Sequence, residues 1–175
     1  MLIGTRITCA EHALQPDWWQ LYEAAFPRSE RRNAGQHAAA LAHPHFHVLH
    51  LADATGFVGL LSYWQWDELA FVEHLAIVPE RRGQGLGRRA LSLLNDAQVI
   101  LEIEPVVDAG TARRLAFYES CGFSRLPQLH IQLAYQAGEP DIPLWLLSRP
   151  MLAAGDVERF EKLYAAGPMR SRDEA

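Results

Sequence analysis

The sequence has few cysteines and no long apolar run. Its two cysteines, Cys9 and Cys121, are far apart and lie outside any CxxC pair. This excludes a disulfide framework and is typical of a reducing compartment, so we expect a cytoplasmic protein. No segment approaches about eighteen consecutive apolar residues. The N-terminus also lacks the apolar stretch of a signal peptide, so we expect no contact with a membrane.

An excess of positive charge is also missing. The formal net charge is -5, which argues against a general nucleic-acid binder because such proteins present a basic face. Apolar residues make up 49% of the chain, enough for a core of its own, and no repeat or linker divides it. We therefore expect a single domain over residues 1–167 and a flexible C-terminal tail over residues 168–175. The sequence leaves a homodimer open.

The spacing of apolar residues predicts a mixed α/β fold. The expected strands cover residues 2–8, 46–53, 55–67, 69–78, 99–106, 129–135 and 143–148. The expected helices begin near residues 17 and 35, run over about 85–97 and over 111–120, and include a last amphipathic one around residues 157–164. Short turn signals separate the three consecutive strands between residues 46 and 78, and links this short join antiparallel neighbours. The prediction is therefore a largely antiparallel sheet flanked by helices, not a doubly wound parallel sheet.

One loop carries most of the chemical information. In the segment LAIVPERRGQGLGRRAL (residues 75–91), three glycines alternate at Gly83, Gly85 and Gly87, and four arginines flank them. Glycine lets the backbone approach a ligand closely, and the N–H groups at a helix start attract anions. The pattern predicts a pyrophosphate site. The alternative is a plain glycine-rich turn with a solvated basic helix start, which would leave the clustering of the arginines without a reason.

A dinucleotide site is one interpretation of this loop. The letters GLGRRA (residues 85–90) satisfy the GxGxxA fingerprint, and Glu102 or Glu104 lies close to the expected acidic position. That fingerprint belongs in the first βα unit of a parallel sheet. Here three strands with antiparallel-type links precede it, so the match is weak evidence.

The second interpretation rests on a resemblance that extends further along the chain. Arg82, Gly85 and Gly87 resemble the [QR]-x-x-G-x-[GA] loop of the GCN5-related N-acetyltransferases (GNAT), and AFYESCGF (residues 116–123) resembles the closing FYExxGF signature of that family. The resemblance implies an acyl-CoA N-acyltransferase fold with two central parallel strands, here residues 72–78 and 99–104, splayed around acetyl-CoA. One departure is Thr111, at a position where many members carry an asparagine that touches the cofactor.

The resemblance also implies a function and a cofactor site. The expected activity is transfer of an acetyl group from acetyl-CoA (coenzyme A) to an amine of a small molecule or a protein, by direct attack in a ternary complex. A catalytically silent CoA-binding sensor or interaction module is the other alternative. The residues that the resemblance places at the cofactor are Leu75, Ala76, Ile77, Arg82, Gly83, Gln84, Gly85, Leu86, Gly87, Arg88 and Tyr118.

Tyr118 is the candidate general acid, because the tyrosine of the FYE signature commonly has this role in the family. Its alternative is an aromatic on the core face of a helix. Glu102 matches a strand position that carries a general-base glutamate in some ribosomal-protein acetyltransferases, and Glu73 is the other candidate base. The alternative for both is a solvated glutamate at a strand edge. His74 follows Glu73, so on a regular strand the two would face opposite sides.

Other conspicuous residues have simpler interpretations. On the strand at residues 99–106, Glu102 and Glu104 should share one face. The histidines at positions 43, 45, 47 and 50 suggest an exposed, polar strand edge, and we expect no metal because no cysteine or carboxylate completes a ligand set. The aromatics Trp18, Trp19, Tyr22, Trp64 and Trp66 either line an acceptor cleft or pack in the core. Cys121 should be a packing residue and not a nucleophile.

Overall fold

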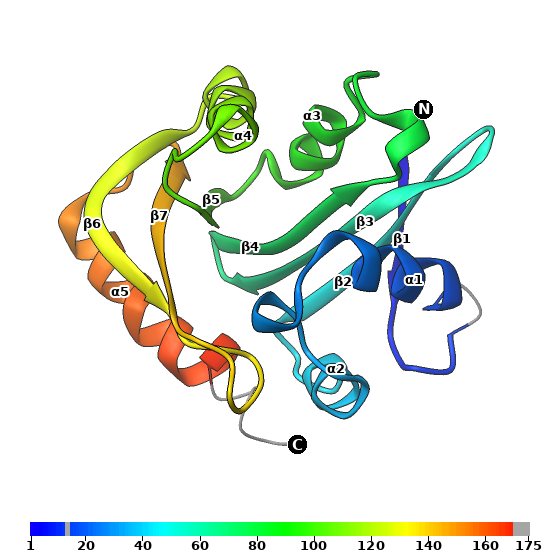
Figure 1. Ribbon diagram of the computed structural model, residues 1–175, viewed down its shortest axis with the longest axis horizontal. Coiled ribbons are helices and arrows are strands. Elements are labelled where there is room, and N and C mark those ends of the chain that lie inside the picture. Colours follow the sequence, from blue (N-terminus) through cyan, green and yellow to red (C-terminus); the bar gives the residue numbers. More distant parts are fainter. Residues whose placement is uncertain (13–14, 170–175) are drawn as a thin grey trace.

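The computed structural model describes residues 1–12 and 15–169, which form a seven-stranded sheet with helices on both faces (Figure 1). The strands are β1 (Ile3–Ile7), β2 (Phe46–Asp53), β3 (Gly56–Trp66), β4 (Leu69–Ile77), β5 (Gln98–Ile103), β6 (Ser124–Gln132) and β7 (Ile142–Arg149). The helices are α1 (Gln15–Ala25), α2 (Ala34–Leu41), α3 (Leu86–Leu91), α4 (Ala109–Ser120) and α5 (Ala154–Tyr164), with short turns η1 (Arg28–Glu30), η2 (Pro79–Arg81), η3 (Ser92–Leu94) and η4 (Ala165–Met169).

The sheet order is β1-β2-β3-β4-β5-β7-β6. Only β4 and β5 run parallel among the pairs of this sheet, and every other neighbouring pair is antiparallel. The predicted mixed, largely antiparallel sheet with two central parallel strands is therefore confirmed. Residues 170–175 of the expected tail lie outside the described residues, whereas Pro168 and Met169 belong to η4.

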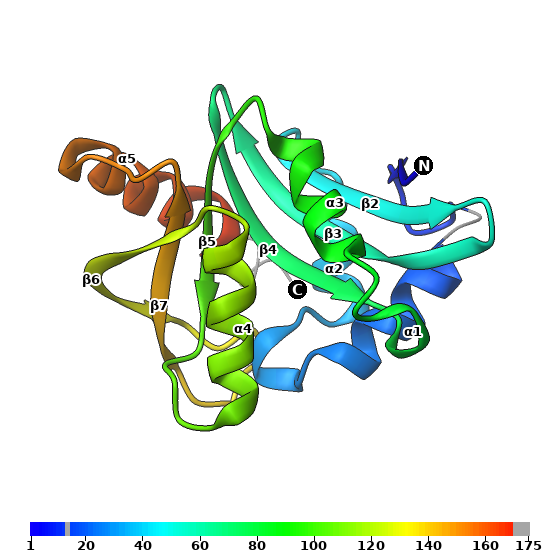
Figure 2. The same cartoon turned by 90° about the horizontal axis from the view of Figure 1, so that it is seen from above.

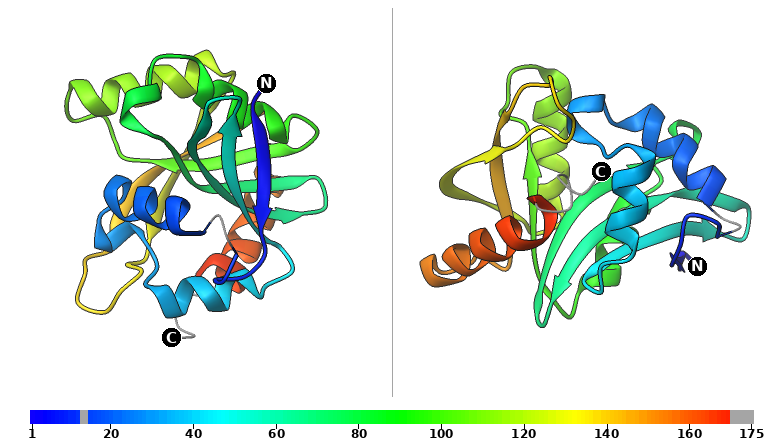
Figure 3. Two further views of the ribbon diagram at one scale, coloured as in Figure 1. Left: turned by 90° about the vertical axis from the view of Figure 1, so that its right-hand side faces the viewer. Right: turned by 90° about the horizontal axis from the view of Figure 1, so that it is seen from below.

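Helices cover the two faces of the sheet in separate groups. Helices α3 and α4 lie over one face, and α1, α2 and α5 lie over the other (Figures 2 and 3). The first group packs on a core that includes Leu86, Leu91, Leu101 and Phe123. The predicted helix from residue 85 to residue 97 is shorter in the structure, because α3 ends at Leu91 and a 3₁₀ turn follows, with the Ser92 hydroxyl bonded to the Arg89 carbonyl.

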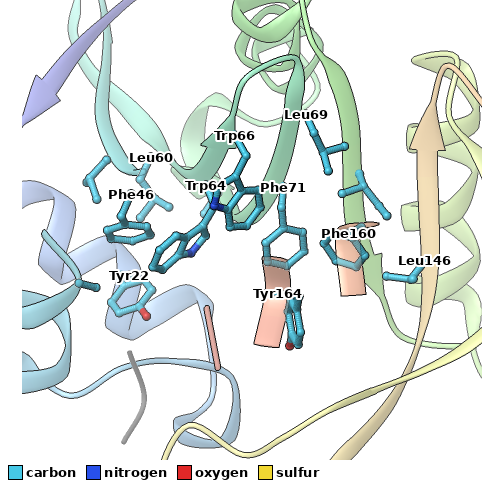
Figure 4. Close-up of a cluster of buried hydrophobic side chains, with 14 of the residues drawn as sticks. Tyr22, Phe46, Leu60, Trp64, Trp66, Leu69, Phe71, Leu146, Phe160 and Tyr164 are labelled. Atoms are coloured by element: carbon cyan, nitrogen blue, oxygen red, sulfur yellow. The ribbon is translucent and has the colours of Figure 1, made fainter. Parts of the chain in front are cut away.

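The aromatic residues that could have lined an acceptor cleft are in the second core. Trp18, Tyr22 and Trp64 have no exposed side-chain surface, and they pack between the sheet and helices α1, α2 and α5. In Figure 4 the rings of Tyr22 and Trp64 lie in the same layer as those of Phe71 and Tyr164. The core interpretation of these residues is therefore the correct one.

The predicted exposed edge at β2 is wrong. The strand lies inside the sheet, because β1 pairs along its outer side and β3 along the other. His50 is accordingly only 5% exposed. Half-buried His47 stacks on Tyr63, with ring centroids 4.9 Å apart. His47 and His50 therefore pack within the fold, whereas His45, just before the strand, is exposed.

The real edge at the other end of the sheet is β6, and its alternation is inverted. His130 and Gln132 are buried, whereas Leu129, Ile131 and, just beyond the strand, Leu133 are exposed. Because successive residues of a strand face opposite sides, burying the polar set necessarily exposes the apolar set. The buried histidine of this strand is part of the site described below.

The two parallel strands separate halfway along their length. Only residues 69–72 of β4 pair with β5, opposite residues 98–101. Just beyond, the ladder with β3 is irregular: Tyr63 pairs with Val72 and Ser62 with His74, so Glu73 is an extra residue in β4. A bulge of this kind bends the strand and increases its twist. The bend coincides with the divergence of β4 from β5 that Figure 2 shows.

Candidate active site

The divergence of β4 and β5 opens a cleft of about 580 Å³. Its floor and sides come from the two strands, and α1, η1, α4, β6 and β7 contribute the rest of the wall. The charged and polar side chains that line it are Glu30, Glu73, His74, Arg82, Glu102, Glu104, Arg114, Tyr118 and Gln132. The cleft therefore brings together all three predicted catalytic residues, Tyr118, Glu102 and Glu73.

Glu73 is a fixed carboxylate. Its side chain is 1% exposed, and its oxygens accept hydrogen bonds from Arg32 Nη1 at 2.6 Å and Nη2 at 2.9 Å. The Tyr135 hydroxyl donates a third bond at 2.8 Å. The alternative of a solvated glutamate is therefore wrong for Glu73.

His74 lies on the same side of β4 as Glu73, contrary to the expectation for a regular strand. Its Nδ1 is 3.7 Å from Glu73 Oε2, because the bulge at Glu73 interrupts the alternation of faces. The ring also hydrogen-bonds the Ser62 hydroxyl at 3.1 Å and the Glu30 carbonyl at 2.8 Å. His74 thus ties β3 and β4 to η1 at the wall of the cleft.

Glu102 faces a buried histidine. His130 Nε2 of β6 lies 2.6 Å from Glu102 Oε1, and the two side chains are 3% and 7% exposed. The geometry of the two atoms falls short of an ideal hydrogen bond. His130 Nδ1 is 3.3 Å from Glu161 Oε1 on α5, whose side chain is 44% exposed. The strand-edge alternative is therefore wrong for Glu102 as well.

The charge of His130 follows from these contacts. Burial lowers the pKa of the ring, but the hydrogen-bonding and charge interactions with Glu102 and Glu161 outweigh it and raise the pKa from 6.5 to about 9. His130 is consequently a cation at neutral pH, enclosed between two carboxylates.

Glu104 and Glu30 complete the acidic part of the cleft. Strand β5 ends at Ile103, one residue before Glu104, which lines the same cleft as Glu102 and forms an ion pair with Arg114 of α4. The hydrogen bond to Glu104 raises the pKa of Arg114. Burial, with a further contribution from the Glu104 charge, raises the pKa of Glu30. This end of the cleft suits a cationic group.

Tyr118 of α4 lines the same cleft as the buried carboxylates. Its ring packs edge-on against Phe117 of α4 and against Phe123, which precedes β6. Burial raises the pKa of its hydroxyl to about 12, so it remains a proton donor throughout the neutral range. Tyr118 therefore contacts both the core and the cleft, so it packs as a core aromatic and is also placed to act in the cleft.

The glycine loop between β4 and α3 is open toward the cleft end of the sheet. Gly83 and Gly85 have φ angles of +75° and +73°, in the left-handed region that glycine favours, and a Cβ at either position would meet nothing within 4 Å. Gly85 is also the N-cap of α3, and no side chain bonds its first turn. The first N–H groups of the helix are thus available to an anion. Gly87 differs, because its Cβ would lie 3.0 Å from Phe117 Cζ.

The arginines around this loop have folding roles that the sequence did not reveal. Arg81 forms an ion pair with Asp53 at 2.6 Å, and Arg88 donates to the Ser120 carbonyl at 2.7 Å. Arg82 donates to the Ile77 carbonyl at 3.0 Å and also lines the cleft. Their clustering therefore serves to anchor the loop as well as to surround it with positive charge.

Thr111, the departure from the family pattern, is engaged in a helix cap. Asp108 accepts from the Thr111 amide at 2.8 Å, and the Thr111 hydroxyl bonds the Asp108 backbone in return. This capping box starts α4. Cys121 is 6% exposed, as expected of a packing residue. Across residues 1–12 and 15–169, no three His, Cys, Asp or Glu side chains gather as a metal site requires.

Several residues of the site could not be identified from the sequence. Arg32 and Tyr135 hold Glu73, and His130 and Glu161 flank Glu102, yet none belongs to a motif. The one available signal was the charged turn after α1, which contains Arg32 but does not show that its side chain is buried.

These features define a class of protein. A mixed sheet whose central parallel strands diverge around a cleft, with a glycine loop opening the next helix and a tyrosine on the facing wall, is an acyl-CoA N-acyltransferase fold. Residues 42–125 match the family model described as an acetyltransferase (GNAT) domain. Within the described residues, no helix has the length and apolar character needed to cross a membrane.

Individual relatives agree with this class. YjbC of Bacillus subtilis (strain 168), whose name assigns it to the acetyltransferases, is 27% identical over 162 residues, 90% of this chain and 74% of that protein. A structure from Bacteroides thetaiotaomicron described as a GNAT-family acetyltransferase superimposes with a TM-score of 0.83 at 28% identity, over 93% of this chain and 96% of that one. An aminoglycoside 6'-N-acetyltransferase complexed with coenzyme A has the same fold, with a TM-score of 0.60 at 15% identity over 83% and 95% of the chains.

The family-model match, the acetyltransferase relative and the structural neighbour together support a GNAT-family acyltransferase. The family uses acetyl-CoA as the acyl donor. The dinucleotide interpretation of GLGRRA is therefore wrong: the loop follows the fourth strand of an antiparallel run and not the first strand of a parallel sheet.

Proposed function

We propose that this enzyme transfers an acetyl group from acetyl-CoA to an amine acceptor held in the same cleft. The observation that carries the proposal is the separation of β4 from β5 beyond Val72, which leaves the inner edge of β4 without a strand partner next to a cleft lined by Tyr118 and Glu102. All residues of the proposed site lie within residues 1–167, which we propose as the single catalytic domain.

The cofactor fits the groups that the cleft offers. We assign the pantetheine arm to the backbone of Leu75, Ala76 and Ile77, and the pyrophosphate to the N–H groups of residues 83–88 at the start of α3. Open space above Gly83 and Gly85 supports this assignment, as does the absence of a side-chain cap on α3 in the described structure. Arg82 borders the cleft and adds positive charge.

Tyr118 is placed to act as the general acid. The thioester supplies an activated acyl group, and its sulfur must gain a proton when the carbon–sulfur bond breaks. A buried phenol whose pKa is about 12 keeps its proton until a stronger base forms beside it, and a leaving thiolate is the group that needs that proton. Free N–H groups on the unpaired edge of β4 can meanwhile donate to the carbonyl oxygen.

The acceptor side is the acidic end of the cleft. Glu30, Glu102 and Glu104 line it, and a cationic amine would be attracted there and held close to the thioester. The proposal is for direct attack in a ternary complex, with the acceptor an amine of a small molecule or a protein.

An activity measurement tests this function. The enzyme is mixed with acetyl-CoA and a panel of primary amines, including polyamines, amino sugars and peptides with free N-termini, and both thiol release and the mass of the acetylated product are followed. We expect release of the thiol that depends on the amine, with an equal amount of N-acetyl product. Binding of acetyl-CoA without transfer to any amine would leave the sensor alternative as the better description.

A further inference from the structure

The proposed reaction has to dispose of a proton. The amine lone pair forms the new nitrogen–carbon bond, and the carbon–sulfur electron pair leaves with sulfur. An alkylammonium nitrogen carries three hydrogens and the amide product one; sulfur takes one, so one proton remains. A carboxyl group with an ordinary pKa of about 4.3 is a poor acceptor for a proton that the ammonium holds with a pKa of about 10.4. A stronger base behind the cleft carboxylate would remove this mismatch.

The structure contains such a base behind Glu102. Glu102 lines the cleft, His130 Nε2 lies 2.6 Å from its Oε1, and Glu161 Oε1 lies 3.3 Å from His130 Nδ1 on the far side of the ring. These three side chains form a row from the cleft to the surface: Glu102, then the His130 ring, which is 3% exposed, then the Glu161 carboxylate on α5, which is 44% exposed.

We propose that Glu102 and His130 together accept the proton of the amine, with Glu161 as the residue that orients the ring. This inference rests on the proposed function. Only the neutral form of the ring can accept, and its share grows as the pH approaches 9. In that form the proton passes from the ammonium to the Glu102 carboxylate and from Oε1 to the lone pair of His130 Nε2, while the Nδ1 hydrogen stays in its hydrogen bond to Glu161. His130 and Glu161 are positioning residues, because both act through Glu102. After the product leaves, the proton returns through Glu102 to water in the cleft.

The surroundings of His130 favour this role. Apart from the two glutamates, the ring meets Phe160 and Tyr164 of α5, with Tyr164 edge-on at 4.8 Å, and Leu144 of β7 is its partner across the strand pair. An imidazolium with a pKa of about 9 is only slightly more acidic than an alkylammonium, so the transfer is nearly balanced. A glutamate that fixes the Nδ1 hydrogen leaves Nε2 to exchange the proton, as in other carboxylate–histidine pairs.

The geometry at Nε2 fits a pair that aligns during the reaction. The ring and Glu102 are within 2.6 Å but off the ideal hydrogen-bond line in the described structure. Such alignments commonly tighten only when substrate is bound. A purely structural ion pair would show the same distance, so the test has to separate the two roles.

The first test is a histidine titration by nuclear magnetic resonance, without acetyl-CoA or amine. We expect one ring, assigned by its loss in His130→Gln, to titrate near pH 9, and to titrate closer to pH 6.5 or below in Glu102→Gln and Glu161→Gln. A His130 ring that titrates below pH 7 in the wild type, or is insensitive to Glu102→Gln, overturns the proposal. This readout does not depend on activity.

The second test compares two acceptors, an alkylamine with a pKa of about 10 and an aryl amine that is already neutral throughout the assay range. With the alkylamine, wild-type kcat/KM should rise with pH toward about 9, and His130→Gln should lower it about a hundredfold at pH 7.5. With the aryl amine, the same variant should change kcat/KM by less than about threefold, because this acceptor has no proton to give up and only small packing effects of the substitution remain. Equal losses with both acceptors would assign His130 a structural role only.

A matched control is available in His47→Gln. His47 is a half-buried histidine of the sheet, but burial lowers its pKa to about 4 and it is not among the residues that line the cleft. It should leave both pH profiles unchanged, and an altered profile would overturn the link to His130. A wild-type enzyme inactive toward every amine overturns the proposed function and, with it, this role; normal activity with an unchanged His130→Gln profile overturns the role of His130 alone.

Discussion

Arg32 and Glu73 lie 41 residues apart in the chain, yet their side chains form a bidentate ion pair with N–O distances of 2.6 and 2.9 Å. Neither side chain is more than 1% exposed. The pair joins the segment after α1 to the bulge of β4, at the point where the cleft opens. Its main effect should therefore be on stability and on the shape of β4.

Removing one partner of this pair should strongly destabilise the protein. We expect Glu73→Gln to lower the free energy of unfolding by about 3 kcal/mol, because Arg32 would be left as an uncompensated buried charge. Urea denaturation measures this. Replacing both residues by methionine should cost about 1 kcal/mol or less, since an apolar pair needs no compensation.

The surface pair Arg31–Glu23, at 3.1 Å, is the matched control, and Glu23→Gln should change stability by less than about 1 kcal/mol. Where it folds, Glu73→Gln should lose some activity with little pH dependence. A neutral effect of Glu73→Gln on unfolding would contradict the structural role assigned to this carboxylate.

Acetyl-CoA should stabilise the fold and NAD should not. At a ligand concentration of about a hundred times the dissociation constant, binding to the native state adds about 2.7 kcal/mol. Thermal melts with CoA, acetyl-CoA and NAD measure the difference. A midpoint that rises with NAD and ignores CoA would disagree with the assignment of the glycine loop.

Gly85→Asp should abolish CoA binding without preventing folding. The added carboxylate would occupy the open space at the start of α3 and repel the pyrophosphate. Gly138→Asp is the matched control: Gly138 also has a positive φ, +87°, and open space around it, but it lies in the turn between β6 and β7. Calorimetry should show binding lost in the first variant and kept in the second. Equal affinities of the two variants for CoA would show that the pyrophosphate binds at a different place.

Tyr118→Phe should lower kcat by 10² to 10⁴ (about the range for general acid catalysis) with a much smaller change in KM. Because the pKa of Tyr118 is about 12, its ionisation should not limit the wild-type rate below about pH 11. Tyr63→Phe removes a half-buried hydroxyl on β3, outside the cleft lining, and should leave kcat unchanged. A fully active Tyr118→Phe enzyme would show that Tyr118 is a packing residue and not the general acid.

His130 should make stability depend on pH in the alkaline range. Its pKa is raised from 6.5 in the unfolded chain to about 9 in the fold, so the folded state binds the proton more tightly. This contribution, on the order of 3 kcal/mol, is complete below pH 6.5 and is lost as the pH rises through 9. Urea unfolding at pH 6 and pH 9.5 should show a larger drop for the wild type than for His130→Gln. Parallel drops would mean that His130 titrates normally.

The elements and the loop could be predicted because their signals are local. Alternating apolar residues and short turn signals identified β2, β3 and β4, the glycines located the start of α3, and the FYE signature located the end of α4. The resemblance to the GNAT family carried by these motifs predicted that Tyr118 and Glu102 belong to one site, and both line the cleft. Periodicity and short motifs involve only neighbouring residues, so they can be recognised without knowledge of tertiary contacts.

What could not be predicted depends on contacts between distant residues. The bulge at Glu73 contains no glycine or proline that would indicate it in the sequence. Because of the bulge, His74 lies on the same side of β4 as Glu73, whereas a regular strand would place it on the opposite side. On β6, burial of His130 in place of Leu129 is decided by Glu102 and Glu161, which are 28 and 31 residues away in the chain. Ionic partners outweighed hydrophobicity there, and single-strand patterns do not contain that information.

The extra residue in β4 has a consequence for how this chain can tolerate insertions and deletions. Because side chains alternate along a strand, the bulge changes the parity of every residue from His74 to Ile77 relative to β3. Deleting Glu73 would remove the extra residue and leave His74 to Ile77 opposite their present partners on β3, so their faces would be kept, but Arg32 would lose its carboxylate partner. Deleting one residue after the bulge, such as Leu75, would instead shift Ala76 and Ile77 by one position and turn them to the opposite face. The length of β4 beyond the bulge is therefore constrained, whereas the turn around Gly138 can vary in length without changing the face of any residue in the site.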